Sequence, residues 1–97
     1  MSEPIVHELP VPPEAVAEGG QEVLRAFIVG GELHVSLQFA FDRPAIWGTL
    51  LAEAGRHIAR MYSKEGTALY DQARDEIYRS LKAEWSIPTD DGETELT

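Results

Sequence analysis

The sequence predicts an α+β fold in which an antiparallel β-hairpin is followed by two α-helices, in the order ββαα. Three observations support this fold class. Apolar and polar residues alternate on both sides of Gly30-Gly31, apolar residues then recur at helical spacing from Ile46 onward, and a second helical pattern follows Gly66. The fold leaves two open options for the hairpin: an added N-terminal edge strand, or a sheet shared between two copies.

The hairpin prediction depends on turn chemistry and on register. Two glycines allow positive φ at both central positions, as a type I′ turn requires, so Val29 and Glu32 flank the turn. A shift of one residue would divide the apolar side chains between both faces of the sheet. The predicted register places these residues on one face: Leu24, Ala26, Ile28, Leu33, Val35, Leu37 and Phe39.

The first predicted helix begins after Asp42, whose side chain is expected to cap it, and Pro44 is tolerated in its first turn. Gly66 supplies the left-handed stop. We expect the apolar stripe of this helix to pack on the hairpin. The stripe consists of Ile46, Trp47, Leu50, Leu51, Ala54, Ile58, Met61 and Tyr62.

A flank of small residues lies beside that stripe, at Gly48, Ala52, Gly55 and Ala59. A glycine within a helix costs about 1 kcal/mol relative to alanine and is usually tolerated for close approach. The favoured interpretation places the second helix against this flank, and a contact between subunits is the alternative. The second helix is expected to start with Thr67 as its cap and to run to about Trp85.

The chain is expected to contain one domain with two extensions. Residues 1–20 carry four prolines and two glycines and are predicted to form an extended arm, from which "PIVHEL" is the candidate edge strand. Residues 21–86 form the single small α+β domain. Residues 87–97 are polar and acidic, and we expect a disordered tail there.

Composition excludes several classes of function. The 97 residues include 17 acidic and 8 basic residues, giving a net charge of −9, which disfavours nucleic-acid binding. The absence of cysteine excludes disulfides, zinc thiolate sites and a thiol nucleophile. No segment resembles a secretory signal or a membrane span, so a soluble cytoplasmic protein without membrane partners is the expectation.

The second face of the hairpin is the candidate interaction face, because it carries apolar side chains at positions that would otherwise be exposed. Its candidate residues are Val23, Arg25, Phe27, Val29, His34 and Ser36. One interpretation is that the N-terminal arm half covers this face. The other, which we favour, is a self-complementary patch that forms a symmetric homodimer, since a lone hairpin gives two helices weak support.

Catalytic and metal-binding patterns are weak, and no cofactor is predicted. Glu53 and His57 have the i, i+4 spacing of a metal-binding pair, but a histidine hydrogen-bonded to Glu53 is the favoured interpretation. Arg25 and His34 could bind a small anion beside Ser36, although exposed strand positions are polar by default. No serine lies in a nucleophile elbow, and Gly30-Gly31 does not open a helix as a phosphate loop does.

Three segments of the sequence, "HVSL", "FDRPAIWG" and "RHIARMY", carry a family resemblance that spans about residues 22–90 and includes "EWSIPTD". The chain resembles a family of small uncharacterised bacterial proteins classed as a domain of unknown function. The resemblance implies a stand-alone α+β domain and assigns no activity or site residues.

The favoured function is therefore a non-enzymatic protein-interaction or regulatory module that acts as a homodimer, with an unidentified protein partner as a further option. The alternative is a small-ligand binder or minor enzyme that uses His34, Arg25, His57 and Glu53, which requires these four groups to converge. A third hypothesis, an acidic inhibitor of a basic partner, rests on net charge and the tail alone.

Overall fold

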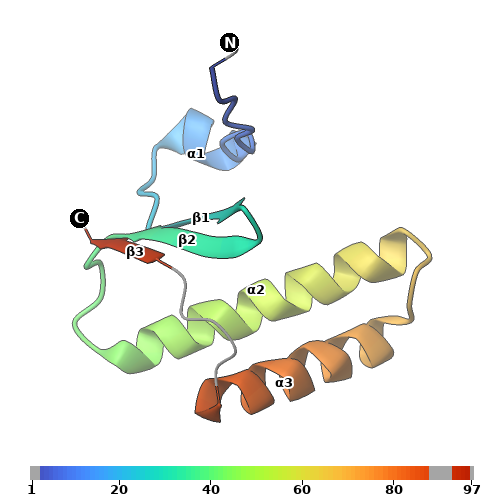
Figure 1. Cartoon of the computed structure of the whole chain (residues 1–97). Coiled ribbons are helices and arrows are strands. Elements are labelled where there is room, and N and C mark those ends of the chain that lie inside the picture. The colour runs from blue at the N-terminus through green and yellow to red at the C-terminus, as the bar shows by residue number, and fades with distance from the viewer. Residues whose placement is uncertain (1–2, 88–92, 97) are drawn as a thin grey trace.

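The computed structural model describes residues 3–87 and 93–96 and contains a three-stranded sheet and a helical hairpin (Figure 1). The elements are α1 (Pro13–Glu18), β1 (Leu24–Val29), β2 (Glu32–Leu37), α2 (Pro44–Lys64), α3 (Tyr70–Ser86) and β3 (Glu93–Leu96). The ββαα order is confirmed, with a short N-terminal helix and a C-terminal strand added. Among the described residues, no helix is long and apolar enough to cross a membrane.

The hairpin has the predicted register. Gly30 and Gly31 have φ values of 59° and 83°, so both central residues of the turn adopt the left-handed conformation that glycine favours. Val29 pairs with Glu32. The apolar cross-strand pairs are Leu24 with Leu37, Ala26 with Val35 and Ile28 with Leu33.

The third strand comes from the C-terminal end of the chain. β3 pairs in parallel with β2, so the strand order is β1-β2-β3, and Thr94 lies opposite Val35. The expectation of a disordered tail was therefore wrong for residues 93–96. The expected edge strand at "PIVHEL" was also wrong, because Ile5–Leu9 forms no strand. Pairing with the free edge of β2 satisfies backbone groups in β3, whatever the polarity of its side chains.

The N-terminal segment is also less extended than predicted. Residues 13–18 form α1, with Pro13 at its first position, where the missing amide costs nothing. In Figure 1 the N-terminal arm and α1 lie on one side of the sheet, and α2 and α3 lie on the other.

The helix boundaries show two corrections. Arg43, not Asp42, occupies the N-cap of α2, and no side chain caps that end. α3 begins at Tyr70 with Leu69 at its N-cap, so Thr67 is not the cap. Instead, the Thr67 amide donates to the Tyr62 carbonyl at 3.1 Å and closes the end of α2 around Gly66, whose φ is 74° as predicted.

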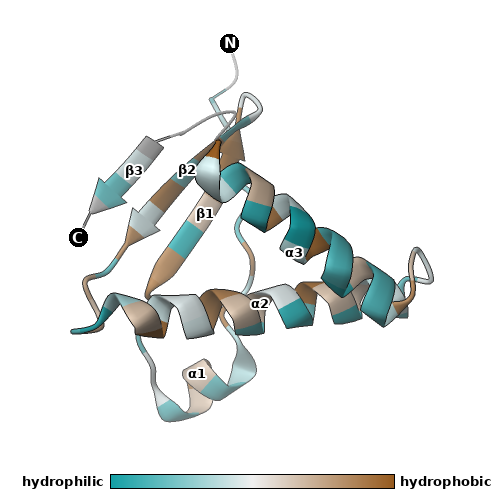
Figure 2. Ribbon diagram, turned by 90° about the horizontal axis from the view of Figure 1, so that it is seen from below, coloured by the Kyte–Doolittle hydropathy of each residue, from teal (hydrophilic) through white to brown (hydrophobic). Residues whose placement is uncertain are grey.

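The two long helices form an antiparallel pair on which alanines are the most buried residues. Among the described residues, Ala59 on α2 is 0% exposed and Ala73 on α3 is 4% exposed, and these two are the only buried apolar side chains. The pair extends well beyond the end of the sheet (Figure 2). The described residues of this fold therefore leave many large apolar side chains exposed to solvent.

Candidate interaction surfaces

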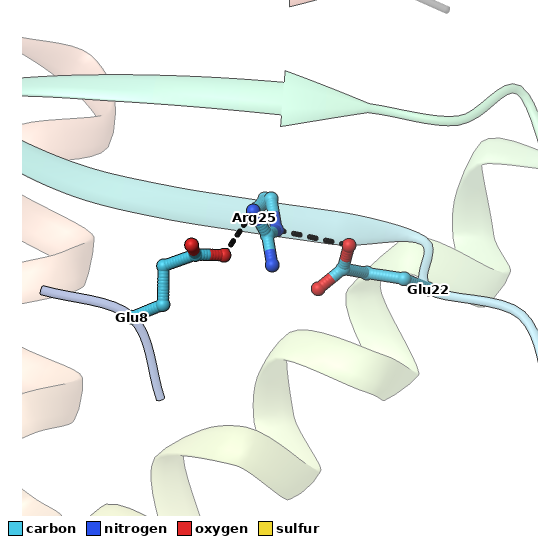
Figure 3. Close-up of polar contacts among 3 residues, drawn as sticks. All are labelled: Glu8, Glu22 and Arg25. Atoms are coloured by element: carbon cyan, nitrogen blue, oxygen red, sulfur yellow. Dashed lines mark ion pairs between the residues drawn. The ribbon is translucent and has the colours of Figure 1, made fainter. Parts of the chain in front are cut away.

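The candidate interaction face of the hairpin lies under the N-terminal arm. Arg25 Nη1 lies 3.0 Å from Glu8 Oε2 in the arm, and Arg25 Nε lies 2.9 Å from Glu22 Oε1 (Figure 3). The guanidinium carbon also lies 5.7 Å from the centre of the Phe27 ring, within the range of a cation–π contact. Hydrogen bonds to Glu22 and then to Glu8 raise the pKa of Arg25 above its ordinary value.

This arrangement divides the six candidate residues into two groups. Val23, Arg25, Phe27, His34 and Ser36 are half-buried, whereas Val29 next to the turn is exposed. His34 Nε2 lies 3.9 Å from Glu32 Oε2 on its own strand. The structure therefore brings the candidate residues together on one face, part of which the chain's own arm occupies.

The opposite face of the sheet is more exposed than the sequence predicted. Ile28 is 72% exposed and Leu33 is 48% exposed, although both belong to the face that the helix stripe was expected to cover. Phe39, just past the end of β2, is also exposed. The expectation that the α2 stripe buries itself on the hairpin was wrong.

The arrangement of the elements accounts for this result. α2 packs against α3, and no Cα atom of α2 lies within 8 Å of a Cα atom in the three described strands. The N-terminal part of the stripe is half-buried at Ile46 and Leu50, but Ile58 and Met61 lie farther along and remain exposed.

An open groove separates the N-terminal half of α2 from the C-terminal half of α3. A Cβ atom added at Gly55 would lie 3.8 Å from Ile77 Cγ2, so the helices are in contact there. A Cβ added at Gly48, two turns earlier, would meet nothing within 4 Å, which shows that the helices diverge. We call the resulting space, of about 1040 Å³, the helix groove. Its main apolar lining residues are Trp47, Leu51, Ile77, Tyr78, Leu81 and Trp85.

The helix groove confirms the favoured interpretation of the small-residue flank only in part. α3 packs against Gly55 and Ala59, as expected of a contact within one chain. Gly48 and Ala52 instead line the open part of the groove and are exposed. The small residues of this flank lie along both the packed and the open part of the helix pair. Their helical spacing did not show at which of them α3 would diverge from α2.

Charged groups at the rim of the helix groove are Arg56, Arg74 and Asp75. Arg74 Nη2 lies 3.7 Å from Asp75 Oδ1, and 3.8 Å from Asp71 Oδ1. Its guanidinium carbon lies 5.7 Å from the centre of the Tyr70 ring. Arg74 thus links side chains of the first two turns of α3 beside the groove.

The four groups of the ligand-binding alternative are dispersed. His57 Nδ1 is 3.2 Å from Arg60 Nη1, so the expected hydrogen bond from His57 to Glu53 was wrong. Neither this groove nor the smaller one beside Tyr62 is lined by His34, Arg25, His57 or Glu53. Over the ranges that the structure describes, no three His, Cys, Asp or Glu side chains are placed to hold a metal ion.

Comparison with known proteins identifies a matching family and a similar solved structure. The profile of the family described as a domain of unknown function (DUF5076) matches residues 8–89. A solved structure, described as that of a candidate pyruvate dehydrogenase from the photosynthetic bacterium Rhodopseudomonas palustrus CGA009, is 40% identical with a TM-score of 0.73. That match covers 100% of this chain and 99% of the other. No curated protein matches the sequence.

Proposed function

From the premise that the chain belongs to the DUF5076 family of unknown function, we propose that it is a non-enzymatic protein-interaction or regulatory module that acts as a homodimer. A single observation carries the proposal: the isolated chain leaves far more surface open than a folded monomer of its size. A second copy is the partner that is always present at the same concentration as the chain itself.

The accessible surface of the chain is 8744 Å². A folded monomer of 10.8 kDa is expected to expose about 5,500 Å², so the excess is about 3,200 Å². The Cα radius of gyration is 15.6 Å, whereas a compact chain of this length is expected to have about 12.5 Å. Both comparisons support the proposal that association completes the protomer.

The composition of the open surface supports the same proposal. Large apolar side chains remain exposed on the sheet, at Ile28 and Leu33, and on α3, at Tyr78 and Trp85. A stable dimer interface buries about 800 Å² on each partner, and obligate dimers bury more. The excess of surface is therefore sufficient for an obligate interface, with area left for other contacts.

The positions of the polar groups support a non-enzymatic role. Pyruvate is a carboxylate, and Arg25 is the cation on the hairpin that was the candidate anion site. Glu8 and Glu22 already occupy this guanidinium, and His57 lies on a separate element with Arg60 as its partner. We therefore do not extend the activity named for the structural relative to this chain.

Co-purification of two differently tagged copies tests the proposal. When the two forms are co-expressed, purification through one tag should recover both in comparable amounts. When the two forms are purified separately and then mixed, mixed dimers should form only slowly, because the subunits of an obligate dimer separate rarely. Recovery of a single tag from co-expressing cells would contradict the homodimer.

A further inference from the structure

We propose that the helix groove is the dimer interface and that its occupant is the helix groove of a second copy of this chain. The two helical hairpins would then pack face to face as a four-helix arrangement. This inference rests on the proposed homodimer, and it adds which surface joins the two copies.

Two aromatic side chains that line the groove on α3 are largely exposed. Trp85 is 78% exposed and Tyr78 is 61% exposed, although both point along the lining of the groove with Leu81 and Leu51. Aromatic side chains bury 150–250 Å² each when covered and dominate the energetics of interfaces. Their exposure beside an unfilled groove indicates a missing apolar partner.

The shape of the groove fits a copy of itself. Each protomer offers a recess at Gly48 and Ala52 on α2, together with a projecting indole at Trp85 on α3. In a twofold interface both subunits use the same patch, so a projection on one copy must be matched by a recess in the same patch of the other. The indole of each copy can enter the recess of the other, where the absent Cβ at Gly48 leaves space.

Charge also favours this face for contact between two acidic chains. Each copy carries a net charge of −9, so association at most faces would bring like charges together. The groove lining contains Arg56 and Arg74 among the chain's eight basic residues and only Asp75 among its 17 acidic residues. The groove lining therefore carries little of the negative charge that opposes association of two copies.

The substitution Gly48→Glu tests the groove directly. Gly48 is helical, and its missing side chain would extend into open space within one chain, so the substitution should not disturb the protomer. In the proposed interface it places a charge in the apolar recess. We expect the dimer dissociation constant to rise at least tenfold. Thr49→Glu, one residue away and exposed, adds the same charge outside the groove lining and should leave the constant unchanged.

Protection of an introduced cysteine from maleimide labelling is a second, independent test, because the chain has no native cysteine. In otherwise unchanged protein, Ala52→Cys should react with a maleimide at least tenfold more slowly than the neighbouring Glu53→Cys, since only position 52 lines the groove. This comparison decides the matter if Gly48→Glu fails to fold, as judged by circular dichroism.

The outcomes separate the two proposals. A wild-type monomer would overturn both the homodimer and the groove interface. A wild-type dimer that survives Gly48→Glu, with equal maleimide rates at positions 52 and 53, would overturn the groove interface alone. In that case the exposed face of the sheet, at Ile28 and Leu33, would become the surface that joins the copies.

Discussion

Gly55 on α2 faces Ile77 on α3, and a Cβ atom added to the glycine would lie 3.8 Å from the Cγ2 atom of the isoleucine. That separation is an ordinary van der Waals contact, so the space at Gly55 admits one methyl group and little more. This pair marks the point where the two helices stop touching and the helix groove begins.

The substitution Gly55→Ala should stabilise the protein. Alanine removes the backbone entropy cost of a helical glycine, and its methyl group fits against Ile77. We expect the free energy of unfolding to rise by about 0.5–1 kcal/mol in urea denaturation at fixed protein concentration. Gly55→Leu should lower it, because a larger side chain must displace Ile77. A loss of stability in Gly55→Ala would show that the helices lie closer than described.

The turn glycines should respond in the opposite direction. Gly31 has a φ of 83°, a conformation that costs a non-glycine residue about 1–2 kcal/mol. Gly31→Ala is therefore expected to lower the free energy of unfolding by about that amount. Gly55→Ala is the matched control, because Gly55 is helical and its substitution should raise the free energy of unfolding by about 0.5–1 kcal/mol. Equal effects of the two substitutions would argue against the type I′ turn.

The arm should detach from the sheet when its ion pair is removed. Glu8→Gln eliminates the charge that lies 3.0 Å from Arg25 Nη1. A spin label at His7→Cys should broaden the Phe27 amide signal in the parent protein and lose this effect in Glu8→Gln. Glu14→Gln, on α1, should retain it. Exposed ion pairs are screened by salt, so about 1 M NaCl should mimic Glu8→Gln.

The arm contact should not depend on the charge of Arg25 over the usual pH range. The folded-state pKa of Arg25 is raised, so the contribution of its charge to stability is complete below its unfolded pKa, which is itself strongly alkaline, and is lost only as pH rises through the higher folded pKa. The broadening at Phe27 should therefore be the same between about pH 6 and pH 9. Its loss within that range would mean that a group other than Arg25 holds the arm.

Removal of β3 should affect β2 selectively. β3 pairs only with β2 among the described strands, so truncation after Ile87 is expected to expose the amides of β2 that face β3. Hydrogen exchange should accelerate at those amides within His34–Leu37. The amides that join β1 to β2 serve as the internal control and should remain protected. Unchanged exchange throughout β2 would contradict the parallel pairing.

Local chemistry explains which parts of the fold the sequence could predict. The Gly30-Gly31 turn and the alternation around it determine the hairpin register, because both signals act over neighbouring residues. The helices follow from apolar periodicity and from Gly66. Helix starts were less accurate, since Asp42 and Thr67 are suitable caps that the structure does not use.

Contacts between distant segments could not be predicted in the same way. The pairing of Thr94 with Val35 joins residues 59 positions apart, and the alternation of the polar segment Glu93–Leu96 is too short to identify a strand. The same holds for Glu8 and Arg25, whose contact places the arm on the candidate interaction face. Periodicity shows that a face is apolar, but it does not show whether the same chain or a second copy covers that face.

Sedimentation equilibrium of the wild-type protein measures the mass of the species in solution without modification and so tests the homodimer itself. We expect a single species of twice the chain mass of 10.8 kDa at micromolar concentration. A mass of one chain across the accessible concentration range would contradict it, since the apolar surface of the sheet and the helix groove would then remain open to water.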